Sequence, residues 1–169
     1  DAANVDLKAF SERFYHKICG GHLQPVLDTL MFIRHETDTW LELTTLLIPG
    51  ENDSDEELNA MTAWVAEHLG PDVPMHFTAF HPDWKMRDIA ATPPATLSRA
   101  RRIAAENGIR YAYTVNVHDA EGGSTWCHQC GELLIERDWY RLGKWALNAK
   151  GRCRHCDASI AGHFGGGPG

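Results

Sequence analysis

The sequence predicts an α/β protein in which a parallel sheet with intervening helices is followed by a small four-cysteine metal module. Three observations support this fold class. Strand-like runs and amphipathic helical runs alternate through residues 1–117, an order that produces parallel β-α-β crossovers. Two CxxC pairs then fall within residues 127–156. The charge also changes along the chain, because residues 1–125 hold 10 Lys and Arg against 19 Asp and Glu, whereas residues 126–169 hold 6 against 4.

The bulk properties limit the organisation and the partners of the chain. Its 169 residues suffice for one domain and a small appendage. We place the sheet domain at residues 1–124, the metal module at 125–164 and a Gly-rich tail at 165–169. The net charge of −7 argues against a nucleic-acid partner. No apolar run is long enough to span a bilayer and no signal peptide opens the chain, so we expect no membrane partner and a cytoplasmic location.

Four elements are expected before residue 50. Residues 2–8 alternate between apolar and polar side chains, which is typical of a strand. A short helix at 11–17 is broken by a pair of glycines, and a longer helix at 22–36 has apolar residues at helical spacing. The run 39–48 is rich in Leu, Ile and Thr, too short for a typical helix and followed by Pro-Gly, so it predicts the second strand.

Further elements continue the alternation up to residue 117. A capping-box pattern begins a helix at Ser54, with Glu57 as the second capping residue. Residues 75–80 predict the third strand, and a loop follows it. The next helix is introduced by two prolines and ends at Gly108, which suits an αL cap. Residues 110–117 predict the fourth strand.

Each predicted strand has an apolar face, which would pack on the helices, and a second face with polar side chains. Parallel sheets are usually buried and apolar on both faces, so the polar face needs an explanation. It indicates either a cavity lined for a polar ligand or a face that simply meets water. The polar set comprises Asn4, Asp6, Lys8, Glu42, Thr44, His76, Thr78, Thr114 and Asn116.

Four cysteines have the spacing of a metal site. They form two CxxC pairs, Cys127 with Cys130 and Cys153 with Cys156. Each pair can turn two thiolates toward one ion, and two pairs complete a tetrahedral site of four sulfurs. Gly131 suits the tight turn after the first pair, whereas Asp157 takes this position after the second. We therefore predict one bound metal ion, zinc or iron.

Two disulfides and a thioredoxin-like redox pair are the alternatives to a metal. Disulfides need an oxidising compartment, for which nothing in the sequence argues. The redox motif opens a helix after a strand, and neither CxxC pair has this context. His128 and His155 lie between ligand cysteines and are expected to be solvated. Cys19, in a Gly-rich loop, is expected to be a structural thiol.

Several stretches of the chain resemble the AmmeMemoRadiSam-system radical S-adenosylmethionine (radical SAM) proteins, relatives of the pyruvate formate-lyase activating enzymes. The resemblance covers nearly the whole chain, and its blocks occur in order with the right intervals. They are NVDLK at 4–8, LLIPGEND at 46–53, FTAFHPDWKM at 77–86, TPPATLSRARRIAAENGIRYAYTVNV at 92–117 and TWCHQCGELLIERDWY at 125–140.

This resemblance implies the C-terminal half of a partial (β/α)6 barrel whose open interior holds a [4Fe–4S] cluster and S-adenosylmethionine. It also implies that Asp6 and Lys8 lie near the S-adenosylmethionine or its associated cation and that His81 lies near the nucleoside portion. Thr44 stands where the activating enzymes commonly have a basic residue, and Asn116 follows a valine where relatives often have glycine. The implied cofactor-binding set is Asp6, Lys8, Thr44, His81 and Asn116.

The cluster motif of the family, CxxxCxxC, does not occur in the chain. Because the sequence also starts within a strand, we expect a C-terminal fragment of a radical SAM enzyme that is inactive by itself. The complete enzyme would use the cluster to cleave S-adenosylmethionine to a 5′-deoxyadenosyl radical, acting on a protein or small-molecule substrate, with a Memo-like protein as a candidate partner. The alternative is a non-catalytic protein in which the metal ribbon docks a partner and the sheet domain is a scaffold.

Overall fold

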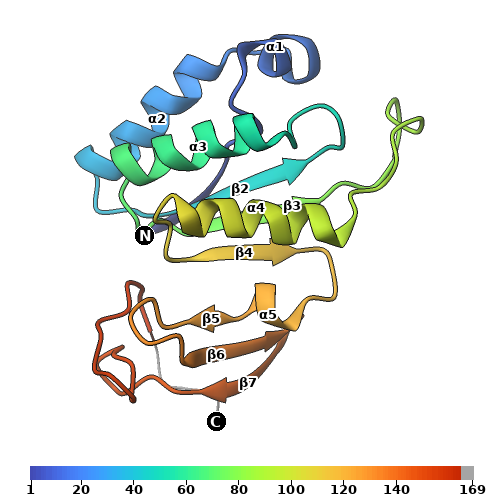
Figure 1. Ribbon diagram of the computed structural model, residues 1–169. Helices are drawn as coiled ribbons and strands as arrows, with labels where there is room; N and C mark the ends of the chain where they lie inside the picture. The colour runs from blue at the N-terminus through green and yellow to red at the C-terminus, as the bar shows by residue number, and fades with distance from the viewer. Residues whose placement is uncertain (165–169) are drawn as a thin grey trace. The chain divides into compact units, whose positions relative to one another are not determined.

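The computed structural model describes residues 1–164, and the predicted Gly-rich tail at 165–169 lies outside the described residues. The chain divides into two compact units, one from Asp1 to Val117 and the other beginning at His118 (Figure 1). Each unit has a sheet of its own. The boundary predicted at 124–125 falls inside the second unit, directly after its short helix.

The first unit is built on a four-stranded parallel sheet whose strands pair in sequence order, β1-β2-β3-β4. The strands are β1 (Ala2–Asp6), β2 (Trp40–Leu47), β3 (Met75–Ala79) and β4 (Ala112–Val115). A sheet whose order follows the chain can place its crossovers on one face, as in a β/α barrel. The α/β class and the parallel sheet are confirmed. The partial six-stranded barrel remains a prediction, because β1 and β4 are edge strands among the described residues.

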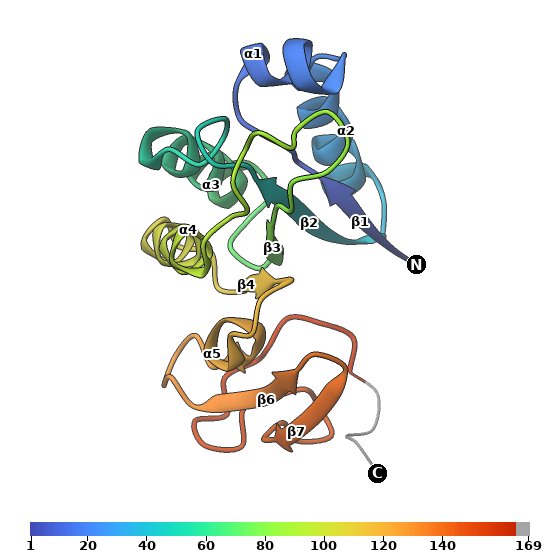
Figure 2. The same ribbon diagram turned by 90° about the vertical axis from the view of Figure 1, so that its right-hand side faces the viewer.

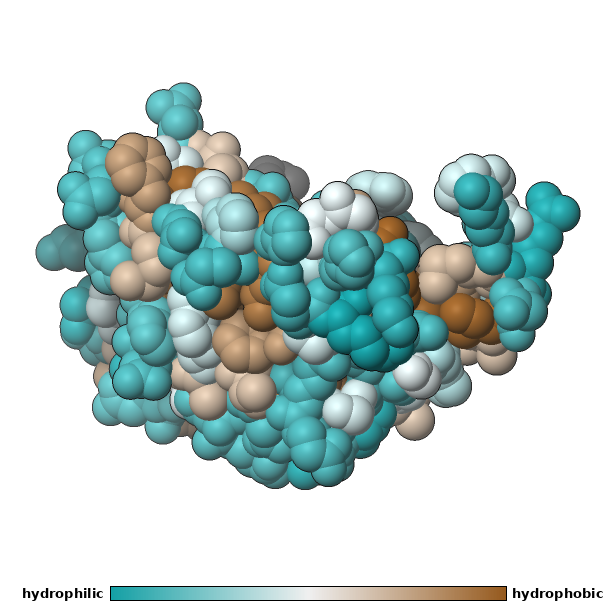
Figure 3. Space-filling model, turned by 90° about the horizontal axis from the view of Figure 1, so that it is seen from above, coloured by the Kyte–Doolittle hydropathy of each residue, from teal (hydrophilic) through white to brown (hydrophobic). Residues whose placement is uncertain are grey.

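Helices connect the strands and cover one face of the sheet (Figure 2). Helix α1 (Glu12–Phe14), the π-helical segment η1 (Tyr15–Cys19) and α2 (Leu23–Glu36) lie between β1 and β2. Helix α3 (Asp55–His68) precedes β3, and α4 (Pro94–Glu106) precedes β4. The surface seen from above, over these helices, is mostly hydrophilic (Figure 3). Within residues 1–164, no helix has both the length and the apolarity needed to cross a lipid bilayer.

The helix ends follow local signals in the sequence. Ser54 caps α3, because its hydroxyl oxygen accepts the backbone amide of Glu57 at 3.2 Å. The carboxylate of Glu57 does not complete the predicted capping box and instead accepts the backbone amide of Phe10 at 2.7 Å, which ties the segment after β1 to α3. Gly108 follows α4 in the left-handed region with a φ of 91°, as the αL cap predicts.

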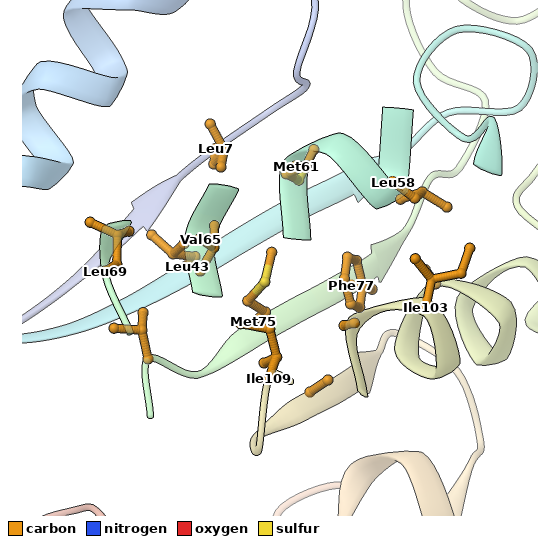
Figure 4. Packing of buried hydrophobic residues seen from close by; sticks show 14 of the residues in the cluster. Leu7, Leu43, Leu58, Met61, Val65, Leu69, Met75, Phe77, Ile103 and Ile109 are labelled. Atoms are coloured by element: carbon orange, nitrogen blue, oxygen red, sulfur yellow. The ribbon is translucent and has the colours of Figure 1, made fainter. Parts of the chain in front are cut away.

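An apolar cluster fills the space between the helices and the sheet (Figure 4). Leu43, Met75 and Phe77 project from the strands and are fully buried against helix residues such as Met61 and Ile103. Burying one such side chain completely contributes about 1.5–3 kcal/mol to stability. One face of the sheet is therefore committed to packing, and the opposite face carries the polar side chains.

The second unit contains a short helix and a three-stranded antiparallel sheet of order β5-β6-β7. These elements are α5 (Ala120–Gly123), β5 (Thr125–Trp126), β6 (Leu133–Asp138) and β7 (Arg141–Trp145). The first CxxC pair lies between β5 and β6, and the second follows β7. The buried apolar side chains of this unit include Leu134, Ile135, Leu147 and Ile160, a smaller set than in the first unit.

Candidate metal centre and ligand-binding face

The two CxxC pairs adopt the same turn. Gly131 donates its amide to the carbonyl of Cys127 at 2.9 Å, and Asp157 donates its amide to the carbonyl of Cys153 at 2.9 Å. Both donors lie in the left-handed region, with φ of 72° for Gly131 and 60° for Asp157. Glycine adopts this conformation without strain, and aspartate is among the few other residues that tolerate it. The sequence therefore identifies both turns correctly.

The four sulfur atoms of the module lie within 4.8 Å of one another. The Sγ atoms of Cys127 and Cys156 are 3.6 Å apart, and those of Cys130 and Cys153 are 3.8 Å apart. Tetrahedral zinc with Zn–S bonds of about 2.3 Å holds its sulfurs about 3.8 Å from one another, so this donor set fits one such ion. A disulfide would need a separation of about 2.05 Å, and all five cysteines are free.

The thiols of the centre differ in how readily they ionise. Burial opposes the charged form of Cys153, but backbone amides of Cys156 and His155, together with neighbouring thiols, outweigh it and lower its pKa to about 7. The backbone amide of Glu132 favours the thiolate of Cys130, yet desolvation and the surrounding sulfurs prevail and raise its pKa to about 12. A metal must therefore displace protons from part of this set when it binds.

The remaining sulfur and imidazole groups of the sequence analysis do not join the centre. His128 and His155 are exposed between the ligand cysteines, as predicted. Cys19 is exposed at the end of η1 rather than buried as a structural thiol would be. The four-cysteine group is thus the metal candidate, while the choice between zinc and iron remains a prediction.

The sheet face opposite the helices carries a connected polar group. Nε2 of His76 lies 2.7 Å from Oε2 of Glu42, across two neighbouring strands. The indole N–H of Trp40 donates to the other carboxylate oxygen of Glu42 at 2.9 Å. The ring of Tyr113 stacks on the imidazole of His76, with centroids 5.3 Å apart and an interplanar angle of 25°. We call Trp40, Glu42, His76 and Tyr113 the imidazole group.

Strand register brings two of the predicted cofactor residues into line with this group. Asp6 pairs with Thr44, Thr44 with His76 and His76 with Tyr113, so these four residues form one row across the sheet. Lys8 follows β1 and forms an ion pair with Asp6, the Nζ–Oδ2 distance being 3.0 Å. Both side chains of this pair remain partly exposed. The row therefore presents charged and hydrogen-bonding groups on the face away from the core.

The other two predicted cofactor residues lie beyond the carboxyl ends of their strands. His81 follows β3 and is exposed, with its Nδ1 atom 3.1 Å from Oδ2 of Asp83. Asn116 follows β4 directly, is exposed and has a φ of 62°. In parallel barrels this end of the sheet is where ligands bind. The binding roles of Asp6, Lys8, Thr44, His81 and Asn116 remain predictions.

A buried amide fixes the position of Lys8. Asn52 is fully buried, and its side-chain N–H groups donate to the carbonyls of Lys8 at 2.6 Å and Leu46 at 2.9 Å. Its side-chain oxygen accepts the backbone amide of Ile48 at 2.7 Å. This single side chain therefore joins the loop after β2 to the end of β1 and sets the backbone from which Lys8 projects.

The register corrects one predicted face. Thr114 was expected on the polar face, but it pairs with Phe77, and only 5% of it is exposed. Tyr113 occupies the polar face in its place, beside His76. Threonine is compact enough to be buried once its hydroxyl is bonded, as Thr45 shows by donating to the carbonyl of Leu7 at 2.8 Å. Polarity alone therefore misassigned β4, whereas the bulk of tyrosine was a usable signal for the face away from the helices.

The loop of residues 81–91 is closed at its base by Thr92. The Thr92 hydroxyl donates to the carbonyl of Leu47 at 2.6 Å and accepts the amide of Phe80 at 2.9 Å, and the Thr92 amide donates to the Phe80 carbonyl at 3.0 Å. Trp84 in this loop has a φ of 45° and is 77% exposed. A bulky residue is rarely found in this region of backbone space, and such residues cluster at functional sites.

Together these features define a class of protein: an α/β domain with a polar sheet face, joined to a four-sulfur metal module. No protein-family model matches the sequence. An uncharacterized protein of Methanocaldococcus jannaschii, MJ0808, is 39% identical over 161 residues, which is 95% of this chain. The match takes in 48% of MJ0808, so the chain spans about half the length of that relative.

A solved structure shares the fold. It is a domain of a pyruvate-formate lyase-activating enzyme from Bacteroides vulgatus, with a TM-score of 0.58. The alignment covers 67% of this chain and 66% of that one, at 14% sequence identity. At this identity the likeness establishes a common fold and says nothing by itself about shared chemistry.

Proposed function

We propose that this chain is the C-terminal part of a radical SAM enzyme of the AmmeMemoRadiSam type, in which the sheet domain binds S-adenosylmethionine. The observation that carries the proposal is the fold shared with an activating-enzyme domain. The row that begins with Asp6 and Thr44 supports it, because a polar face on a parallel sheet fits a zwitterionic ligand better than a packing surface. The substrate of the whole enzyme would be a protein or a small molecule, and a Memo-like protein is a candidate partner.

The described cysteines do not fit a [4Fe–4S] cluster of this class. Cys19 is distant in sequence from the others and exposed, and the remaining four lie as close together as the ligands of a single ion. The cluster would accordingly be bound by residues outside this chain, and the isolated chain would be inactive. When bound in the complete enzyme, the cluster with S-adenosylmethionine would supply a 5′-deoxyadenosyl radical.

The chain's own residues would bind and orient the cofactor. Asp6 and Lys8 offer one negative and one positive group to the ammonium and carboxylate of the ligand, and each is now neutralised by the other. Exchange of this exposed pair for a ligand costs little, since surface ion pairs contribute about 0–1 kcal/mol. Thr44 adds a hydroxyl on the same row, and His81 and Asn116 would close over the nucleoside from the loops after β3 and β4.

The test is calorimetric titration of S-adenosylmethionine into the metal-loaded chain. Binding should be lost in Asp6→Ala and kept in Asp28→Ala, an exposed carboxylate on α2 that serves as the matched control. The free energy of unfolding of both variants should stay within about 1 kcal/mol of the wild type. Absence of binding by the wild type would instead favour the non-catalytic scaffold, in which the metal ribbon docks a partner.

A further inference from the structure

We propose that His76 is a proton acceptor on the polar sheet face, held by Glu42 in the tautomer that carries its proton on Nε2. Its Nδ1 atom would take a proton from an O–H or N–H group of a ligand lying against Asp6 and Thr44. The location of that ligand rests on the proposed function, whereas the state of His76 does not. The ligand class is therefore a small polar molecule with a hydroxyl or amino group.

The tautomer follows from the contact with Glu42. A carboxylate only accepts hydrogen bonds, so the 2.7 Å contact between Nε2 of His76 and Oε2 of Glu42 requires the hydrogen on Nε2. In the neutral imidazole, the Nδ1 atom is then the ring nitrogen with a free electron pair. Among residues 1–164, no hydrogen-bond partner reaches this Nδ1 atom. A basic nitrogen is thus left available on a face that the core does not use.

Two neighbours hold the pair in this arrangement. The indole N–H of Trp40 binds the second oxygen of Glu42 at 2.9 Å and so prevents the carboxylate from rotating freely. The ring of Tyr113 lies almost parallel to the imidazole and limits its tilt. Orienting an imidazole by a carboxylate on one nitrogen is the arrangement that prepares the other nitrogen for proton transfer.

The pair is shielded and yet reachable. The exposed fraction of the side chain is 24% for His76 and 33% for Glu42. In the transfer itself, the Nδ1–H bond forms as the O–H or N–H bond of the ligand breaks, and the electron pair of that bond stays on the ligand.

The row geometry places the imidazole beside the predicted cofactor residues. His76 pairs with Thr44, which pairs with Asp6. Neighbouring strands lie about 4.8 Å apart, so the backbones of His76 and Asp6 are separated by about 10 Å across the sheet. A small ligand against this row can touch both side chains at once. The sequence placed His76 on the polar face but gave no sign of its pairing with Glu42.

The first measurement is the nitrogen spectrum of the imidazole rings in the 15N-labelled chain at neutral pH. In the wild type, Nε2 of His76 should be protonated and Nδ1 unprotonated. Glu42→Gln should populate both tautomers, because an amide can donate as well as accept. Glu36→Gln, at the end of α2, is the matched control and should leave the His76 signals unchanged. A protonated Nδ1 or a tautomer mixture in the wild type would overturn the proposal.

The second measurement is acylation by diethyl pyrocarbonate, which attaches an ethoxycarbonyl group to an accessible unprotonated imidazole nitrogen and is located by peptide mass spectrometry. His76 should react, and saturating S-adenosylmethionine should slow that reaction severalfold while leaving the exposed His35 unaffected. An unreactive His76, or one that remains unprotected while the ligand binds, would make the pair purely structural. If S-adenosylmethionine fails to bind, the proposed function fails, and the reactivity of His76 still decides the present inference.

Discussion

Replacing Asn52 by alanine tests whether one buried amide holds the end of β1 in place. The side chain makes three hydrogen bonds, to the backbone of Lys8, Leu46 and Ile48, in a site with no solvent exposure. Each bond contributes about 1 kcal/mol net, and a buried group left without a partner costs about 1–3 kcal/mol. We therefore expect Asn52→Ala to lower the free energy of unfolding by about 3–5 kcal/mol.

Urea denaturation followed by far-UV circular dichroism measures this loss, with the denaturant slope of the variant matching that of the wild type. Asn59→Ala is the control, because Asn59 carries the same amide at an exposed position of α3 and should change stability by less than about 0.5 kcal/mol. A loss below about 1 kcal/mol for Asn52→Ala would refute the reasoning, since it would mean that water or a shifted backbone satisfies the three groups.

Three further outcomes are expected. Elemental analysis should find close to one zinc or iron per chain. Chelation should unfold the second unit, because structural zinc contributes about 10–16 kcal/mol to the folding free energy of finger peptides. Intact disulfides without metal would contradict this prediction. Gly131→Ala should destabilise the metal-loaded chain by about 1–2 kcal/mol in thermal melting, because alanine is strained in the left-handed conformation of this residue. A steric clash is not expected to add to this loss, since no atom lies within 4 Å of the added Cβ. An unchanged melting temperature would show that the turn relaxes. Burial raises the pKa of Tyr15 in the folded protein. The neutral phenol is therefore compatible with the fold below the unfolded pKa of about 10, and stability is lost as the pH rises through the higher pKa of the folded protein. In urea denaturation above that pH, the wild type should therefore lose more stability than Tyr15→Phe, and parallel pH profiles of the two proteins would disprove the assignment.

Local patterns predicted the elements because their causes are local. Alternation identified β2, where Leu41, Leu43 and Leu47 are buried and Glu42 lies on the opposite side. Helix ends were predictable where one residue makes the signal, as with Ser54 and Gly108. The cysteine turns were predictable for the same reason, since a CxxC pair and the residue after it contain the whole motif.

Contacts between segments that are distant in the sequence could not be predicted from local patterns. Glu42 and His76 belong to different strands, and their pairing depends on the register of β2 with β3. The carboxylate of Glu57 was expected to bond within its own helix, but tertiary packing brings the Phe10 amide to it. Thr114 shows the complementary limit, because a polar residue can be buried whenever the fold supplies its partner. Alternation fixes which residues share a face, while packing decides which face is covered.

The hydrogen bonds of Thr92 allow the loop between Phe80 and Thr92 to vary in sequence and length. Its two ends are joined to each other and to Leu47 by three bonds, and Met86 and Ile89 pack against the cluster of Ile48 and Phe80, so the strands depend on these contacts and not on the exposed residues in between. Doubling the length of a flexible loop costs only about 0.6 kcal/mol in closure entropy. Related proteins can therefore exchange the residues around Trp84 for longer, shorter or differently charged ones at little thermodynamic expense, and diversify what they recognise while the strands beneath stay the same.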